Sequence, residues 1–276
     1  MIKQGIDISA HNGNIDWTQT KSCIDAVIIR AGYGKNNIDQ KWVPNVEAVL
    51  NSTLDVGCYW FSYAYTEDMA YLEGRYAALA AQKKFGSRKI PVAFDLEYDS
   101  VEYAKKKGVT IDRTAATKYA IAFMNAVKEL GFRPMLYTNV DYIRNYFDLD
   151  AIRSAVPDFL LWLACWGKKP DVYGDMADVW QHSSKGTVAG IEGNVDMDEV
   201  YIDLELKGEA AAPVESAVAS SGQQKKVTAT ILNIRKEPSA KSEDLGDLPK
   251  GTIITVDRTE KGWAHFEGWL SAQYLK

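Results

Sequence analysis

The stretch PVAFDLEYDS, residues 91–100, decides how this chain is expected to fold and where its chemistry is expected to lie. An apolar run ends in two carboxylates, Asp95 and Glu97, that are two positions apart. Side chains alternate along a β-strand, so both carboxylates should point to the same side of one strand end. Ionised groups are costly to bury unless they are paired, bind a metal or perform a chemical task. The stretch therefore predicts a buried strand that leads into a functional site.

Strand and helix patterns alternate on either side of this stretch, from residue 1 to about residue 206. Short apolar runs rich in β-branched and aromatic residues alternate with segments of helical spacing, the clearest of which are 67–86 and 112–132. Parallel strands buried on both faces produce this pattern. About eight strands fit a closed barrel better than an open sheet, and the helical segments thin out after residue 159. We therefore predict an α/β fold, an irregular (βα)5β3 TIM-like barrel, with a doubly wound sheet as the alternative.

The composition changes sharply after the barrel pattern ends. Residues 207–224, KGEAAAPVESAVASSGQQ, are rich in Ala, Ser, Gly and Pro and have no apolar period, which is typical of a linker. Residues 225–276 contain several short strand-like runs separated by turn signals, which predicts a small all-β barrel. The predicted organisation is thus a catalytic barrel over 1–206, a linker over 207–224 and a second domain over 225–276.

Charge and apolar patterning exclude some functions. The net charge of -5 argues against nucleic acid as the main partner, because phosphate-binding surfaces usually carry a basic excess. No apolar run reaches the ~18 residues of a membrane span, and MIKQGIDISA lacks the features of a secretion signal. We therefore expect no stable membrane association and synthesis in the cytoplasm. The scattered Cys23, Cys58 and Cys165 are interpreted as buried apolar residues, and we expect no zinc, other metal or cofactor.

Further carboxylates are predicted to join Asp95 and Glu97. Asp7 follows the first strand-like run, and Asp196 and Asp198 lie on the last. Carboxyl ends of parallel barrel strands meet at one face, where clustered acids raise each other's pKa. One acid can then hold a proton while its neighbours stay ionised, which is what glycoside hydrolysis requires. Helix capping, a structural cation and a Mg²⁺ or Ca²⁺ site are the alternatives for such a cluster.

Aromatic residues near the predicted strand ends suit the binding of sugar rings. The candidates are Trp60, Tyr63, Tyr65, Tyr137, Trp162, Trp166 and Trp180. Each single one is more often core than contact, but Tyr63 and Tyr137 end their strands beside polar residues. Arg30 is a charge inside an apolar strand and is predicted to pair with the acidic cluster. His182 is interpreted as an interior histidine rather than a base, and His11 is given no catalytic role.

Several motifs together resemble the glycoside hydrolase family 25 muramidases, in order from residue 2 to about 203. They are GIDIS…NGNIDW, VIIRAGYG, FSYA, VAFDLE, MLYTN, LWLACWG and VWQHSS…GIEGNVDMD. The resemblance implies a (βα)5β3 barrel that cleaves the β-1,4 bond between N-acetylmuramic acid and N-acetylglucosamine in peptidoglycan. It also implies Glu97 as general acid/base, with Asp95, Asp7 and Asp196 as accompanying carboxylates. Substrate-binding candidates within these motifs are Tyr63, Tyr137, Trp166, Arg30 and Gln181. AHNG after Asp7 departs from the family's usual residues there.

The C-terminal segment resembles bacterial SH3-like cell-wall-binding domains, through LNIRKEPS, LGDLPKGTIITV and KGWAHFEGWLSAQYLK. This implies wall peptide or glycan as its ligand, with Trp263, Trp269 and Tyr274 as candidate contacts. The combination resembles a phage endolysin that is made in the host cytoplasm without a signal peptide and acts on the bacterial cell wall. A non-catalytic wall-binding protein and a metal-dependent hydrolase are the competing interpretations.

Overall fold

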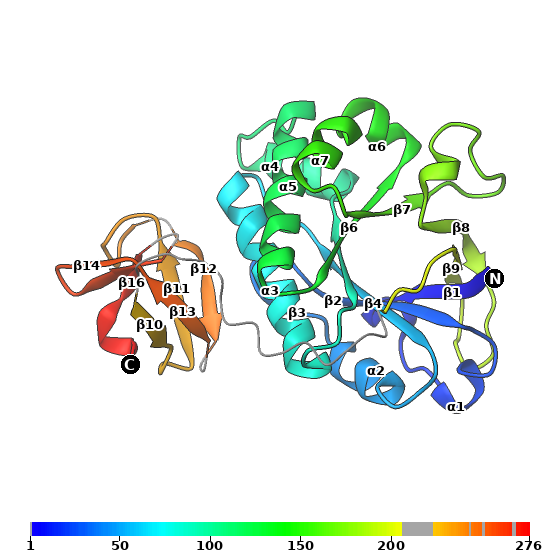
Figure 1. Cartoon of the computed structure of the whole chain (residues 1–276), viewed down its shortest axis with the longest axis horizontal. Coiled ribbons are helices and arrows are strands. Elements are labelled where there is room, and N and C mark those ends of the chain that lie inside the picture. The colour runs from blue at the N-terminus through cyan, green and yellow to red at the C-terminus, as the bar shows by residue number, and fades with distance from the viewer. Residues whose placement is uncertain (1, 206–222, 243, 250–251, 267–268) are drawn as a thin grey trace. The chain divides into compact units, whose positions relative to one another are not determined.

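The computed structural model describes residues 2–205, 223–242, 244–249, 252–266 and 269–276 (Figure 1). The chain divides into two compact units, Met1–Ala210 and Ala211–Lys276. The predicted linker, 207–224, lies outside the described residues except for Gln223 and Gln224, which begin the first strand of the second unit. The domain boundaries given above therefore stay predictions.

A nine-stranded sheet builds the first unit, and within the described residues all of its strands except β3 close into a ring. Neighbouring strands from β1 to β8 run parallel, β3 (Asn37–Ile38) is a short antiparallel addition to β2, and β9 (Val195–Val200) closes the ring antiparallel to both β8 and β1. The parallel strands are β1 (Lys3–Ile8), β2 (Ala26–Tyr33), β4 (Asp55–Phe61), β5 (Pro91–Asp95), β6 (Arg133–Asn139), β7 (Leu160–Ala164) and β8 (Val179–Gly186).

Helices connect the first strands of the ring but not the last. They are α1 (Trp17–Thr20), α2 (Trp42–Val49), α3 (Glu67–Phe85), α4 (Tyr98–Lys106), α5 (Arg113–Glu129), α6 (Val140–Asn145) and α7 (Leu149–Ala155). After α7, strands β7, β8 and β9 follow one another with only a 3-10 turn between them, so the predicted (βα)5β3 order is confirmed. In the described part of the chain, no helix combines the length and apolarity that crossing a membrane requires.

The two long helices begin and end at the signals that the sequence carries. The Thr66 hydroxyl accepts a hydrogen bond from the Met69 amide at the start of α3, and Gly86 follows the helix with φ 62°. The Asp112 carboxylate caps α5 in the same way, accepting from the Ala115 amide at 2.8 Å. Such caps satisfy backbone groups that a helix end leaves unpaired. Both predicted helical segments are therefore confirmed, and α3 and α5 pack against each other.

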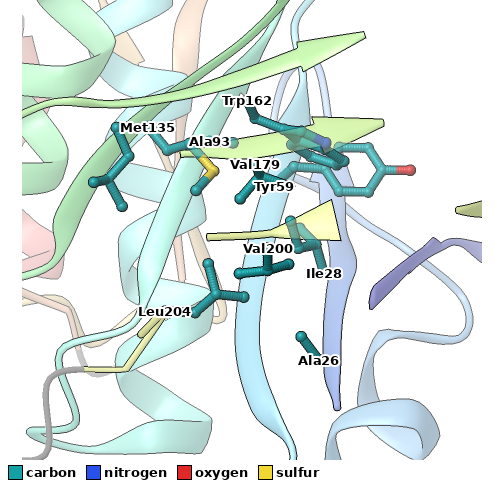
Figure 2. Close-up of a cluster of buried hydrophobic side chains, with 10 residues drawn as sticks. Ala26, Ile28, Tyr59, Ala93, Met135, Trp162, Val179, Val200 and Leu204 are labelled. Atoms are coloured by element: carbon teal, nitrogen blue, oxygen red, sulfur yellow. The ribbon is translucent and has the colours of Figure 1, made fainter. Parts of the chain in front are cut away.

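Apolar side chains fill the inside of the ring (Figure 2). The buried cluster takes residues from almost every strand: Ala26, Ile28, Tyr59, Ala93, Met135, Leu160, Trp162, Val179 and Val200, with Leu204 below β9. Because side chains alternate, the next inward residue toward the mouth is Asp95 after Ala93, Tyr137 after Met135, and Gln181 after Val179. The strands therefore change from apolar to polar at one end of the barrel, which is where the site forms.

The second unit is all-β in its described part, as predicted. A five-stranded antiparallel sheet, in the order β12-β11-β16-β15-β14, accompanies a two-stranded pair, β10-β13. The strands are β10 (Gln223–Lys226), β11 (Ile231–Arg235), β12 (Asp244–Pro249), β13 (Ile253–Val256), β14 (Arg258–Glu260), β15 (Trp263–His265) and β16 (Trp269–Ser271). Leu232, Ile234, Leu248 and Leu270 are buried in it, which gives the small unit a core of its own.

The cysteine interpretation holds for one residue of the three. Cys58 is buried on β4, but Cys23 is exposed and Cys165 is half-buried. Cys23 lies in the turn after α1, and its apolar neighbours in the sequence belong to the following strand. Apolar neighbours in the sequence therefore did not predict the exposure of Cys23, because this cysteine lies in a turn.

Candidate active site

Asp95 and Glu97 meet at the mouth of the barrel, but they do not share a strand. Asp95 is the last residue of β5, whereas Glu97 is the residue before α4 and donates its amide hydrogen to the Ser100 hydroxyl at 3.0 Å. The prediction of two carboxylates on one strand face is therefore wrong for Glu97. The turn into α4 nevertheless brings the two carboxyl groups into a hydrogen bond with each other.

The surroundings of Asp95 and Glu97 raise the pKa of both carboxyl groups. Burial raises the pKa of Asp95 well above its ordinary value, and the Glu97 charge raises it further, while Arg30 lowers it. Burial also raises the pKa of Glu97, and the hydrogen bond from Asp95 lowers it. Two like charges at hydrogen-bond distance cannot both form cheaply. The geometry therefore favours a proton on one member of the pair, and the stronger upward shift of the pKa, caused by burial and by Glu97, falls on Asp95.

Asp7 and Asp196 complete the cluster from the other side of the barrel. They are direct partners across the antiparallel strands β1 and β9. Burial raises the pKa of Asp7 well above its ordinary value, with further increases from Asp198, Asp196 and Glu97. Burial likewise raises the pKa of Asp196. These mutual effects mean that the four predicted carboxyls lie together rather than on distant faces of the barrel.

Gln181 links three of the predicted residues by hydrogen bonds. Its Nε2 donates to Oδ2 of Asp7 at 2.8 Å. Its Oε1 accepts from the Tyr137 hydroxyl at 3.1 Å and from Trp166 Nε1 at 3.2 Å. Gln181 is buried, whereas Trp166 is 64% exposed. The amide therefore holds a buried acid, a half-buried tyrosine and an exposed indole in one arrangement.

Tyr63 and Arg30 lie at the edge of this arrangement. Tyr63 follows β4 and packs against Tyr103, with ring centroids 5.0 Å apart. Arg30 forms its ion pair with the buried Asp39, through Nε at 2.7 Å, and not with the acidic cluster as predicted. Its charge still acts on the cluster, because it lowers the pKa of Asp95. Asp39 captures Arg30 because it also accepts the Ala10 and Lys41 amides, which anchors the loop after β1.

Comparison with known proteins identifies the barrel. Residues 6–191 match the sequence model of glycosyl hydrolases family 25, and residues 230–276 match that of the bacterial SH3 domain. The chain belongs to glycosyl hydrolases family 25. The predicted family resemblance and fold are therefore confirmed, and the SH3-like resemblance is confirmed over the C-terminal strands.

Relatives of this family 25 chain include bacterial and phage proteins. It is 28% identical over 202 residues to the autolytic lysozyme of Clostridium acetobutylicum, covering 71% of this chain and 55% of that one. It is 22% identical over 204 residues to the D-alanyl-L-alanine endopeptidase of Streptococcus phage B30, covering 66% and 45%. The chain thus spans about half the length of these two relatives. The modular autolysin LytC of Streptococcus pneumoniae, in complex with synthetic peptidoglycan ligand, has the same fold, with TM-score 0.60, 23% identity, and coverage of 72% and 47%.

The family 25 barrel also contains buried acids outside the four-carboxyl cluster; sequence reasoning named Asp198 among the strand-end carboxylates but did not find Glu73. Asp198, two residues after Asp196, is fully buried and accepts a hydrogen bond from Trp162. Glu73 on α3 is also buried and accepts the Tyr63 amide at 3.0 Å. The two-residue spacing from Asp196 puts Asp198 on the same, inward-facing side of β9, in line with its prediction among the strand-end carboxylates. Nothing in the local sequence distinguishes Glu73 from a solvent-facing helical acid.

In the described part of the chain, no hydrogen bond or ion pair joins His11 or His182 to the carboxyl cluster. His182 is half-buried beside Trp180, with ring centroids 5.4 Å apart, and His11 lies in the short turn after β1. Among the described residues, no group of three or more His, Cys, Asp or Glu side chains is arranged to hold a metal ion.

Proposed function

We propose that this family 25 chain is a lysozyme-type peptidoglycan hydrolase that cleaves the β-1,4 bond between N-acetylmuramic acid and N-acetylglucosamine. The observation that carries the proposal is the buried Asp95–Glu97 pair, in which burial raises the pKa of both carboxyl groups, beside the paired Asp7 and Asp196. A glycosidase needs an acid that protonates the leaving oxygen, and negative charge that stabilises an oxocarbenium-like centre. One proton shared among clustered acids supplies both.

Glu97 is the general acid in this proposal, and Asp95 supplies its proton. Glu97 is half-buried, so bound glycan would displace the water that stabilises its charge, and its pKa would rise. The proton then moves from Asp95 to Glu97 along the existing hydrogen bond. Glu97 protonates the glycosidic oxygen, while the ionised Asp95 orients the substrate's own 2-acetamido group for attack on the anomeric carbon. Water opens the cyclic intermediate with Glu97 as base, and the configuration is retained.

Glycan recognition falls to Tyr63, Tyr137, Trp166, Arg30 and Gln181 in this proposal. Flat aromatic rings pack against the C–H faces of sugars, and the amide and hydroxyl groups direct sugar hydroxyls. The exposed Trp166 indole is supported by its hydrogen bond to Gln181, so it offers a sugar a ring whose orientation is already set. Binding to such a ring costs little conformational entropy.

Digestion of purified peptidoglycan tests the proposal. Mass spectrometry should show products with new N-acetylmuramic acid reducing ends in the presence of wild-type enzyme. Glu97→Gln should reduce turnover by about 10²–10⁴-fold, the usual contribution of a general acid, without changing the thermal midpoint by more than a few degrees. Glu102→Gln, at an exposed acid on the helix that follows Glu97, should retain wild-type turnover. New N-acetylglucosamine ends, or an active Glu97→Gln, would refute the assignment.

The competing interpretation, a barrel that only binds glycan, predicts that incubation with peptidoglycan releases no new reducing ends. It also gives no reason for several buried acids, because a binding site gains little from groups that are costly to ionise. A metal-dependent hydrolase, the other competing interpretation, predicts that exhaustive chelation stops the reaction. We expect full turnover in the presence of chelator.

The second unit is proposed to hold the enzyme on the wall. A pocket of about 490 Å³ lies among Asn233, Arg235, Trp263, Gln273 and Tyr274. Aromatic rings beside amide and guanidinium groups suit a wall peptide or glycan, and tethering raises the local enzyme concentration at an insoluble polymer. The side chain of Trp269, the third predicted contact, lies outside the described residues. Tyr274→Ala, at a 42% exposed position, should reduce sedimentation of the full chain with purified walls while sparing turnover of soluble glycan.

We further propose that the enzyme serves lysis of a bacterial host by a phage, with synthesis in the host cytoplasm. The likeness to a protein of Streptococcus phage B30 supports this. Purified enzyme added from outside should clear suspensions of Gram-positive cells whose walls it digests in isolation. Failure to act on intact cells, with activity on isolated walls, would argue against it.

A further inference from the structure

Asp198 lies inside the barrel, one step below the mouth. On β9 the inward residues run from Val200, in the apolar cluster of Figure 2, through Asp198 to Asp196 at the mouth. Its cross-strand partners are Gln181 on β8 and Gly5 on β1. Its exposed fraction is 0%. The fold therefore places a carboxyl group between the apolar interior and the acidic site.

Gly5 provides the space that this carboxyl group needs. A Cβ atom at Gly5 would lie 3.2 Å from Cβ of Asp198 and 3.2 Å from Cγ2 of Val200, which is tighter than ordinary van der Waals contact. A side chain on β1 at this level would therefore press on Asp198. The absence of a side chain at Gly5 therefore leaves room for the side chain of Asp198.

The contacts of Asp198 are few and specific. Oδ1 accepts a hydrogen bond from Trp162 Nε1 at 2.8 Å, and Oδ2 is buried with no hydrogen-bond partner among the described residues. A buried polar atom without a partner destabilises the folded state, so an apolar residue of this size would favour stability more. The carboxyl group therefore calls for a role beyond packing.

Trp162 connects Asp198 to the proposed sugar-binding residues. Its indole meets the Tyr137 ring edge-on, with centroids 4.6 Å apart, and the Tyr59 ring at 5.9 Å. The Tyr137 hydroxyl in turn binds Gln181, which binds Asp7. We propose that Asp198 is a positioning residue, which fixes the Trp162 indole and through it the arrangement of Tyr137, Gln181 and Asp7. This inference rests on the proposed hydrolase function and gives a role to a residue that the sequence placed near the site without assigning it one.

Asp198 also acts on Asp7 through charge. The groups that face it are Asp7 from β1, Asp196 from its own strand, Gln181 from β8 and Trp162 from β7, and none of these carries a positive charge. Burial raises the pKa of Asp198 to about 7. Asp198 is also the largest charge influence on the pKa of Asp7. The negative charge that Asp198 carries once it ionises therefore opposes the ionisation of Asp7.

Two variants of Asp198 separate positioning from packing. Asp198→Leu removes the acceptor for Trp162, and Asp198→Asn keeps an acceptor oxygen while it removes the charge. Turnover on purified peptidoglycan should fall about tenfold in Asp198→Leu, and most of the loss should return in Asp198→Asn. Trp162→Phe, which removes only the donor side of this hydrogen bond, should show a similar loss. The double variant Asp198→Leu/Trp162→Phe should lose no more than either single one.

A titration distinguishes this role from a merely structural one. The ionisation of Asp7, followed by ¹³C NMR of labelled aspartate carboxyls and assigned by its absence in Asp7→Asn, should move about one pH unit lower in Asp198→Asn. Additive losses in the double variant, full activity of Trp162→Phe, or an unmoved Asp7 titration would overturn the proposal. If Asp198→Leu does not fold, Trp162→Phe and the titration decide. An inactive wild type would refute the proposed function instead, and the titration would still test Asp198.

Discussion

Asp7 and Asp196 lie directly opposite each other on the antiparallel strands β1 and β9. Like charges in this position are unfavourable, and burial raises the pKa of both carboxyls. The pairing closes the barrel, because β9 is the strand that joins β8 to β1. The β1–β9 pairing that closes the barrel therefore carries two acids at a position where an apolar pair would be more stabilising. The protein is thus less stable than it could be at the proposed active site.

Replacing one member of this pair should stabilise the protein and impair the enzyme. Asp196→Asn removes the like charge opposite Asp7, so the free energy of unfolding at pH 7 should rise by about 0.5–1 kcal/mol. Turnover should fall, because the variant removes a proposed active-site carboxylate. Urea unfolding and peptidoglycan digestion measure the two effects. Asp171→Asn, at an exposed position, should change neither. An unchanged or lower stability of Asp196→Asn would contradict the explanation.

Gln181→Leu should damage both stability and substrate processing. The leucine leaves Oδ2 of Asp7 and the Tyr137 hydroxyl without their hydrogen-bond partner inside the protein. A buried group left unpaired costs about 1–3 kcal/mol, so the chemical denaturation midpoint should drop clearly. The Asp7 carboxyl also loses the hydrogen bond that lowers its pKa. We expect kcat/KM to fall by about tenfold or more.

The matched control for that variant is Ser183→Ala, a half-buried position on the same strand. Its hydroxyl accepts the Lys185 amide at 3.1 Å in an exposed part of β8, so stability and kcat/KM should stay near wild type. Equal losses in the two variants would show that β8 responds to any polar deletion. Gln181 would then have no special role.

Glu73→Gln should change how stability depends on pH. Burial raises the pKa of Glu73 to about 8, whereas the unfolded chain titrates near its ordinary value of 4.5. The folded state therefore binds the extra proton between these values. The stability from this group is complete below about pH 4.5 and is lost as pH rises toward 8, at about 1.4 kcal/mol per pH unit.

The measurement is the free energy of unfolding at several pH values from 5 to 8. Relative to Glu73→Gln, the wild type should become steadily less stable across this range, because glutamine carries no titrating proton. Glutamine retains an oxygen acceptor for the Tyr63 amide, so the loop after β4 should keep its position. Glu102→Gln on α4 should leave the pH dependence of the wild type intact. Parallel curves for wild type and Glu73→Gln would contradict the prediction.

Gly74→Ala sets helix propensity against packing. Alanine is favoured over glycine by about 1 kcal/mol within a helix. At Gly74 on α3, however, a Cβ atom would lie 2.4 Å from the Phe123 carbonyl oxygen on α5. Backbone atoms of two packed helices cannot yield as a flexible side chain can, so overpacking at a cost of about 1–3 kcal/mol should prevail. The thermal midpoint should fall, and a rise would mean that α3 and α5 separate freely.

The order of the helices and strands could be predicted from local sequence patterns. Apolar runs such as PVAF and the periodic segments that became α3 and α5 have their caps at Thr66 and Asp112 beside them, so their existence and type followed from short-range patterns. The acidic residues could be found in the same way, because a charge inside or just after an apolar strand is conspicuous. Convergence of Asp7, Asp95 and Asp196 followed from the parallel-barrel rule that strand ends share one face.

Side-chain contacts between residues from different elements could not be predicted in this way. Arg30 was equally able to reach the acidic cluster or Asp39, and only closure of the loop after β1 brought Asp39 to its guanidinium group. The helix α4 begins immediately after β5, which takes Glu97 out of the strand and turns its carboxyl group back toward Asp95. Gln181 and Trp162 acquire their roles from strands that are distant in the sequence. Local sequence specifies backbone conformation and which side chains face inward, whereas hydrogen-bond partners and raised pKa values depend on burial and neighbours that exist only once the ring of strands has closed.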